Sequence, residues 1–356
     1  MASETRSSKA YVLGVGMTKF IKPRGLRQYP DLGYEAGIKA MLDAQINYDD
    51  VEHGVACFAY GDSTSGQRVF YQFGMSSIPI VNTGNACATG SVGLYLARTL
   101  VQSGKADCVL VVGFEKMNPG SLKSVWSDRP SSSGRFAAKM RELAEPSNSP
   151  LTVQYFANAG REYMTKYGAK KEDFAEIARV SHEHSQRNPY AQFQQKYSLK
   201  EIQDSPTIYS PLTKLQCSPT SDGAAAAVIV SERFLATRPH LKGQAILMAG
   251  QAFCTDSPKT FGNSAMELVG ETRVALQHNL GLGGAVVVNV YKRADGQANI
   301  KISDGEVAKH SWLGYNPAVE ARGITSNDAE RVRSKKHRND FALGETADRI
   351  RAVANL

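Results

Sequence analysis

Short apolar runs alternate with helix-like periodicities over the first third of the chain. Strands are predicted at 10–16, 55–60, 78–81 and 107–113. Helices are predicted at 33–44 and 89–103, where apolar residues recur at helical spacing. The unbroken apolar run inside 107–113 is typical of parallel strands that are buried on both faces. The order strand, helix, strand predicts βαβ units and therefore an α/β sheet.

Residues 118–150 break this pattern. Ser, Pro, Gly and Arg accumulate there, most densely at 130–134, so an excursion over the surface is expected. Long segments of this kind are functional lids or substrate-binding inserts in some proteins and mobile loops in others, and both interpretations stay open. Helical stretches follow at 154–167 and 171–184.

The strand pattern returns in the second half of the chain, at 223–231, 244–250 and 282–291. Segment 245–250 resembles 11–16, and 284–290 resembles 223–230, which indicates two copies of one fold. The gap in the second copy is too short for a doubly wound unit, since each crossover alone needs ~10–12 residues. Either the repeat is illusory, or the second copy has lost its middle and leaves unpaired strand edges.

The composition is that of a globular chain, with 42% hydrophobic and 21% charged residues. No apolar run reaches the ~20 residues that span a bilayer, so no membrane span is expected. The polar start, 1–9, argues against a secretory signal. The net charge is +8, but the dense basic run at 331–338 lies among acidic residues. We interpret it as a solvated face rather than a nucleic-acid site, and the overall charge suits an anionic substrate.

The five cysteines are scattered and form no C-x-x-C pair. A disulfide framework and a zinc site are therefore not expected, and reduced thiols in an intracellular compartment are the better interpretation. Four of them are expected to be small buried hydrophobes: Cys57, Cys108, Cys217 and Cys254.

Cys87 stands between the strand at 78–81 and the helix that begins near Thr89. A thiol there faces the free N–H groups and the positive dipole end of the helix, which favour thiolate. Attack on a thioester would also require oxyanion donors and a base. Small neighbours leave room for a substrate. Position alone leaves a nucleophile and a buried structural thiol equally open.

The segment 85–91, Asn-Ala-Cys-Ala-Thr-Gly-Ser, resembles the nucleophile segment of thiolases, in particular the sterol-carrier type. The resemblance extends over most of 10–291. It rests on further segments at 14–20, 61–64, 66–68, 113–117, 217–227 and 275–285.

The resemblance implies a layered αβαβα fold of two halves, a loop domain inserted in the first half, and homodimers. It implies transfer of an acyl group from a 3-oxoacyl-CoA to CoA through an acyl-cysteine at Cys87. CoA would be a co-substrate, with no bound cofactor and no metal. Substrates of sterol-carrier-type members include oxidised side chains of branched fatty acids and sterols.

Two family segments are absent from this chain: a His-Asp-Cys-Phe segment with the acid/base cysteine, and a Gly-His-Pro segment with the oxyanion-hole histidine. Residues 266–270 run directly into 271–275, where the family has a long intervening block. The N-terminal half is thus expected to be complete and the C-terminal half internally truncated. The expected segments are 1–117 (first part of the N-terminal half), 118–210 (loop domain), 211–242 (end of that half), 243–293 (remnant of the C-terminal half) and 294–356 (appended polar tail, with a helix at 327–342).

His278 is not the missing catalytic histidine. By resemblance it belongs, with Gly281 and Gly283, to a loop that contributes to the floor of the substrate site, and a purely structural histidine is the favoured interpretation.

Two main hypotheses follow: a working thiolase-like acyltransferase, or an inactive isoform, gene-model error or acyl-CoA-binding pseudoenzyme. A lipid carrier is discounted, because the polar tail is too short for a carrier domain. The last three residues, 354–356, resemble a permissive peroxisomal tripeptide. A peroxisomal location is therefore expected, with the cytoplasm or mitochondrion as alternatives.

Overall fold

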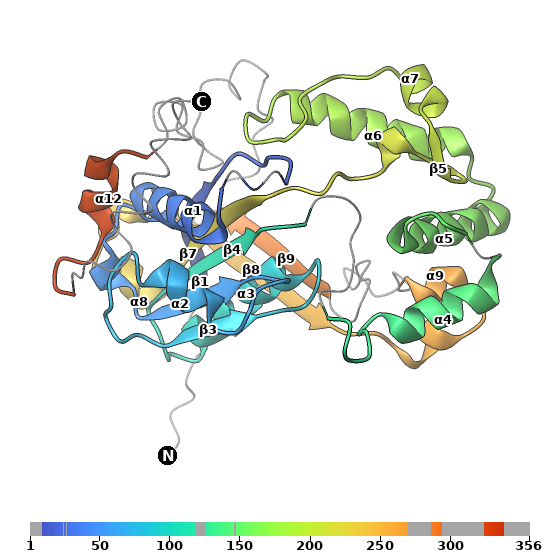
Figure 1. Ribbon diagram of the computed structural model, residues 1–356. Coiled ribbons are helices and arrows are strands. Elements are labelled where there is room, and N and C mark those ends of the chain that lie inside the picture. The colour runs from blue at the N-terminus through green and yellow to red at the C-terminus, as the bar shows by residue number, and fades with distance from the viewer. Residues whose placement is uncertain are drawn as a thin grey trace.

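The computed structural model describes residues 9–23, 25, 27–118, 126–145, 147–269, 286–293 and 324–337. Within these residues, seven strands form one mixed sheet in the order β3-β2-β4-β7-β1-β8-β9 (Figure 1). The strands are β1 (Ala10–Met17), β2 (His53–Cys57), β3 (Ile80–Thr83), β4 (Cys108–Glu115), β7 (Gly223–Ser231), β8 (Ile246–Cys254) and β9 (Val286–Arg293). Every strand predicted from an apolar run is present, with its ends shifted by a few residues.

The N-terminal part of the sheet has parallel and antiparallel neighbours. Strands β3, β2 and β4 are parallel to one another. Strand β7 lies antiparallel between β4 and β1 and pairs with both along nearly their whole length. The stretch 108–112 of β4 is completely buried, which explains its unbroken apolar run.

Helices cover both faces of this sheet. On one face lie α1 (Tyr29–Asp43) and α2 (Ser65–Phe70), and on the other lies α3 (Thr89–Gln102). Helix α1 approaches β1 very closely, because a Cβ placed on Gly14 would lie 2.3 Å from the backbone nitrogen of Ala44. Helix α2 was not among the predicted helices, since six residues are too few to show a helical period.

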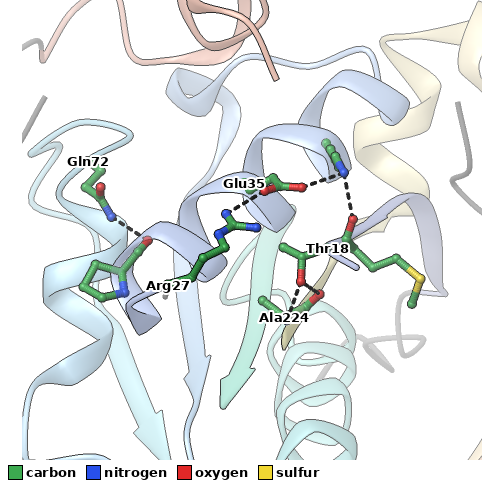
Figure 2. Close-up of polar contacts among 8 residues, drawn as sticks. Thr18, Arg27, Glu35, Gln72 and Ala224 are labelled. Atoms are coloured by element: carbon green, nitrogen blue, oxygen red, sulfur yellow. Dashed lines mark hydrogen bonds and ion pairs between the residues drawn. The ribbon is translucent and has the colours of Figure 1, made fainter. Parts of the chain in front are cut away.

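Buried charges fix the chain between β1 and α1. Glu35 on α1 accepts from Arg27, a contact that Figure 2 shows and that measures 2.7 Å. Its other oxygen accepts from Lys39 at 2.8 Å. The same view shows the contact between Thr18 and Ala224, where the Thr18 hydroxyl accepts from the Ala224 N–H at 3.0 Å. Burial alone would raise the pKa of Glu35, but the two cations outweigh it and lower this pKa below its usual value. The carboxylate therefore stays ionised and ties β1 and α1 together.

The insert between β4 and β7 is mainly helical. Its elements are α4 (Gly134–Leu143), α5 (Leu151–Tyr167), α6 (Lys171–Gln186), α7 (Leu199–Asp204), β5 (Thr207–Tyr209) and β6 (Leu212–Thr213). Helix α4 falls inside the predicted excursion and corrects that expectation. Its residues Phe136 and Met140 pack on Tyr155 of α5 and Leu268 of α9 (Ala265–Leu268), and Figure 1 shows these three helices beside the sheet.

Short helices complete the described chain: α8 (Glu232–Ala236) and the 3-10 turns η1 (Tyr48–Asp50), η2 (Lys214–Gln216), η3 (Pro239–Leu241) and η4 (Pro258–Phe261). In the described parts of the chain, no helix is both long and apolar enough to cross a membrane.

The internal repeat indicated a separate second half, but β8 and β9 do not form a separate sheet. They pair with each other antiparallel, with Ile246 opposite Arg293 and Cys254 opposite Val286. Strand β8 also pairs with β1 through Tyr11 and Val12. These strands therefore extend the first sheet, and β8 has a partner on both sides rather than the open edge that was expected.

The polar tail is also more than an appendage. Helix α12 (Ser326–Val332) packs its Ala329 and Val332 into the core under α1, on the side of the sheet away from α4 and α5 (Figure 1). Arg333, expected on a solvated face, is only 3% exposed and donates to the carbonyl of Gln72 at 3.0 Å. The predicted helix at 327–342 is thus present in part, as α12, but its burial was not expected from a polar sequence.

Asp49 holds the end of this tail segment. Its carboxylate accepts from the Ser334 hydroxyl and from the backbone N–H groups of Lys335 at 2.8 Å and Lys336 at 3.4 Å. Burial would raise the pKa of Asp49, but these hydrogen bonds lower it below its usual value. The stabilisation is therefore present above the unfolded pKa of ~3.9 and is lost as the pH falls through the lower folded value.

Replacing Asp49→Ala should lower the free energy of unfolding by about 2 kcal/mol, because hydrogen bonds to a charged acceptor are lost. Urea denaturation at pH 7 measures this change. Asp204→Ala is the matched control, since Asp204 makes only an exposed helical ion pair with Lys200 and should cost at most about 0.5 kcal/mol. An equal loss of stability in the two variants would contradict a stabilising role of the Asp49 hydrogen bonds.

Candidate active site

Cys87 lies at the sheet edge where β3 ends. The chain leaves β3 at Thr83, makes a tight turn over 84–88 and enters α3 at Thr89. The thiol of Cys87 is exposed. The predicted position between a strand and a helix N-terminus is thus confirmed, and the alternative of a buried structural thiol is wrong.

Thr89 closes the turn that carries Cys87. Its hydroxyl donates to the Ala86 carbonyl at 2.6 Å and accepts from the Asn85 N–H at 2.8 Å. Ala86 has φ of +46°, a left-handed conformation that costs a non-glycine residue about 1 kcal/mol or more. The hydrogen bonds of Thr89 hold this strained residue, and the strain presents the next side chain, Cys87, to solvent.

The N-terminus of α3 contributes a positive electrostatic potential at the turn that carries Cys87. Its N-cap residue, Ala88, has no side chain that could cap the first backbone N–H groups. The positive end of the helix dipole favours negative charge at this position. An exposed nucleophile or the oxyanion of a bound acyl group would benefit from it.

Two further polar residues end neighbouring strands at this edge. Glu115 is the last residue of β4, and Tyr60 follows β2 by three positions. One oxygen of Glu115, Oε2, accepts from the Ala59 N–H at 3.2 Å. Burial raises the pKa of Glu115 to about 7, against the opposing effect of backbone N–H groups from Ala59 and Tyr60. This carboxyl therefore changes its charge close to neutral pH.

The phenol of Tyr60 is 37% exposed and senses both acidic neighbours. Burial raises its pKa, and the charges of Glu115 and Cys87 raise it further. Tyr60 is therefore a neutral hydrogen-bond donor at physiological pH. No role was predicted for Tyr60 or Glu115, although the predicted strands 55–60 and 107–113 end at or near both residues.

A buried ion pair supports the far side of this edge. Asp222 precedes β7 and accepts from Lys116 Nζ at 2.6 Å and from the Met117 N–H at 2.8 Å. The pair joins the end of β4 to the start of β7.

The expected burial of the other four cysteines is confirmed for some and not for others. Cys57 and Cys108 are buried, as expected, and burial raises the pKa of Cys57 to about 11. Cys217 is half-buried and Cys254 is exposed, so the expected burial is wrong for Cys254. His278, Gly281 and Gly283 lie outside the described residues.

A cavity of about 520 Å³ lies among α4, α5 and α9 rather than at Cys87. Its lining carries charges of both signs, with Arg141 and Arg161 beside Glu142 and Glu162. None of its described lining residues belongs to the Cys87 turn. The exposed turn, not this cavity, carries the reactive groups.

A sheet with a solvent-facing cysteine, next to a strained alanine and at the N-terminus of a covering helix, agrees with the comparison with protein families. The family described as "Thiolase, N-terminal domain" matches residues 10–233. The chain belongs to the thiolase family. The matched range includes Cys87, Tyr60, Glu115 and all of β7.

Curated relatives point to the sterol-carrier branch. The chain is 49% identical over 265 residues to "Sterol carrier protein 2" of Gallus gallus, an alignment that covers 74% of this chain and 48% of that protein. The chain thus spans about half the length of this thiolase relative.

Solved structures confirm the thiolase-like α/β fold. The "Ltp2-ChsH2(DUF35) aldolase" matches with a TM-score of 0.58 and 27% identity, over 70% of this chain and 62% of that one. Human mitochondrial 3-ketoacyl-CoA thiolase in complex with CoA matches with a TM-score of 0.52 and 16% identity, over 76% and 74% of the two chains. At this identity the second likeness concerns the fold alone.

Thr89→Val should destabilise the protein by about 1–3 kcal/mol, because the Asn85 N–H and the Ala86 carbonyl lose a buried partner. Chemical denaturation measures the change. Thr89→Ser is the matched control, since it keeps the hydroxyl and should retain most of the stability. A loss as large in the serine variant would mean that the methyl group, not the hydroxyl, supports the turn.

Proposed function

We propose that this chain is an acyl-CoA acyltransferase of the thiolase type in which Cys87 accepts the acyl group. The observation that carries the proposal is the exposed Cys87 at the N-terminus of α3, within the residues that match the thiolase domain. The proposed substrates are 3-oxoacyl-CoA esters of lipid or sterol side chains, by likeness to the sterol-carrier relatives.

The proposed reaction has two halves. The Cys87 thiol gives its proton to a base, and its sulfur attacks the 3-oxo carbon of the substrate. The bond between carbons 2 and 3 then breaks, and the departing acetyl-CoA carbon takes a proton. In the second half, the sulfur of CoA attacks the acyl-cysteine carbonyl and regenerates the Cys87 thiol. Both halves build an oxyanion that hydrogen-bond donors must stabilise.

Turnover by this chain is proposed to be impaired. Its sequence has neither the His-Asp-Cys-Phe nor the Gly-His-Pro segment that supplies the acid/base cysteine and the oxyanion-hole histidine in the family. Losing a general acid/base typically costs ~10²–10⁴ in rate, and losing an oxyanion donor costs ~10²–10³. The same absence favours a second candidate, an inactive isoform or acyl-CoA-binding pseudoenzyme.

Five further properties of the chain are proposed together with this function. They are CoA as the co-substrate, a homodimer, a peroxisomal location, an internally truncated C-terminal half, and a substrate-lining role for the loop with His278, Gly281 and Gly283. Each follows from the family resemblance.

A thiolysis assay with acetoacetyl-CoA or a longer 3-oxoacyl-CoA tests the impairment. We expect kcat at least about a hundredfold below that of a full-length relative, because acid/base and oxyanion support are both missing. Cys87→Ser should remove whatever activity remains, while Cys254→Ser, the control at the other exposed thiol, should not. Turnover equal to that of the relative would refute the impairment, and equal loss in both variants would refute the assignment of Cys87.

A further inference from the structure

Glu115 and Cys87 are joined by a continuous set of contacts across three strand ends. Glu115 at the end of β4 holds the Ala59 N–H, and the preceding residue, Phe58, donates its N–H to the Thr83 carbonyl at 3.3 Å. Thr83 is the last residue of β3, and its hydroxyl lies 3.5 Å from the Thr89 carbonyl. These hydrogen bonds connect Glu115 to the turn that carries Cys87.

The other oxygen of Glu115 is unusual. Oε1 is buried, and the described residues provide no hydrogen-bond partner for it. An unsatisfied buried carboxylate oxygen is costly and calls for an explanation. Protonation removes this cost, in agreement with the raised pKa of about 7. The Glu115 carboxyl therefore gains and loses its proton near neutral pH.

The groups around Glu115 shift its pKa in opposite directions. Asp222, from the start of β7, raises its pKa, and Ala59 and Tyr60 lower it through their N–H groups. Lys116 is engaged by Asp222 at 2.6 Å. Tyr60 stands in the electrostatic range of both Glu115 and Cys87. The charges of the carboxyl and of the thiol thus both act on the Tyr60 phenol.

We propose that Glu115 is a positioning residue of the Cys87 site, whose carboxyl fixes the segment with Tyr60 and, by gaining or losing its proton, sets how readily Cys87 reacts. The proposal rests on the proposed function only in taking Cys87 as the reacting group. An ionised Glu115 opposes negative charge on the sulfur, and a protonated Glu115 does not. Reactivity should therefore rise less steeply with pH once Glu115 has ionised.

The test is the rate at which iodoacetamide alkylates Cys87 between pH 5.5 and 9, followed by mass spectrometry of the Cys87 peptide. Alkylation requires no acyl transfer, so it stays informative even if the chain is no acyltransferase. In the unmodified protein, the profile should show a second inflection near pH 7 that the profile of Cys254, the other exposed thiol, lacks.

Glu115→Gln keeps an oxygen for the Ala59 N–H and removes the charge. Its alkylation rate should match that of the unmodified protein near pH 5.5 and exceed it by about three- to tenfold at pH 8.5, from the loss of one nearby negative charge. Glu115→Asp restores a carboxyl and should restore the inflection. Asp43→Asn is the matched control, because Asp43 is another carboxyl whose pKa is raised by burial and which accepts a backbone N–H, from Val15 at 2.9 Å.

A single-ionisation profile for Cys87 in the unmodified protein would overturn the proposal, whatever the variants do. So would a profile of Glu115→Gln that follows the unmodified protein at every pH, or an equal change in Asp43→Asn. A defect in folding alone changes the rate of alkylation at all pH values and does not selectively remove the inflection near pH 7.

Discussion

The structure depends on one geometric constraint: parallel strands of a sheet end at the same edge. Because β3, β2 and β4 run in parallel, the residues that follow them must meet there. Cys87, Tyr60 and Glu115 are far apart in the chain and come together for this reason. The β3–α3 connection then has to turn sharply, and the hydrogen bonds of Thr89 make that turn possible despite the left-handed Ala86.

Strand β7 stabilises this arrangement from the other side. It runs antiparallel between β4 and β1, and Asp222 at its start binds the end of β4. The buried Glu35 with its two cations then fixes α1 on the same sheet. These contacts all lie within residues 10–233, which match the thiolase N-terminal domain. The turn that carries Cys87 is thus supported by residues of the matched range.

The sequence predicted the sheet better than it predicted the site. Apolar runs located β4 and β7, and helical spacing located α3, because these elements are buried along their length and their pattern is set locally. Helix α4 was missed, since it is short and only tertiary contacts bury its few apolar residues. The tail helix α12 was predicted, at 327–342, but its shorter extent and its packing into the core were not. Cys87 was found from its local setting and its resemblance to the thiolase nucleophile. Glu115 was not, because its burial and its contact with Ala59 arise only when β2 and β4 pair.

The central claim is that Cys87 is a competent acyl acceptor in a chain with impaired turnover. The most direct measurement is the mass of the cysteine peptides after incubation with acetyl-CoA and rapid acid quenching. The account predicts an acetyl group on Cys87, transferred from acetyl-CoA as free CoA departs, and no acetyl group on the exposed Cys254. Acetylation of Cys254 to the same extent, or no acetylation of Cys87 at saturating acetyl-CoA, would contradict it.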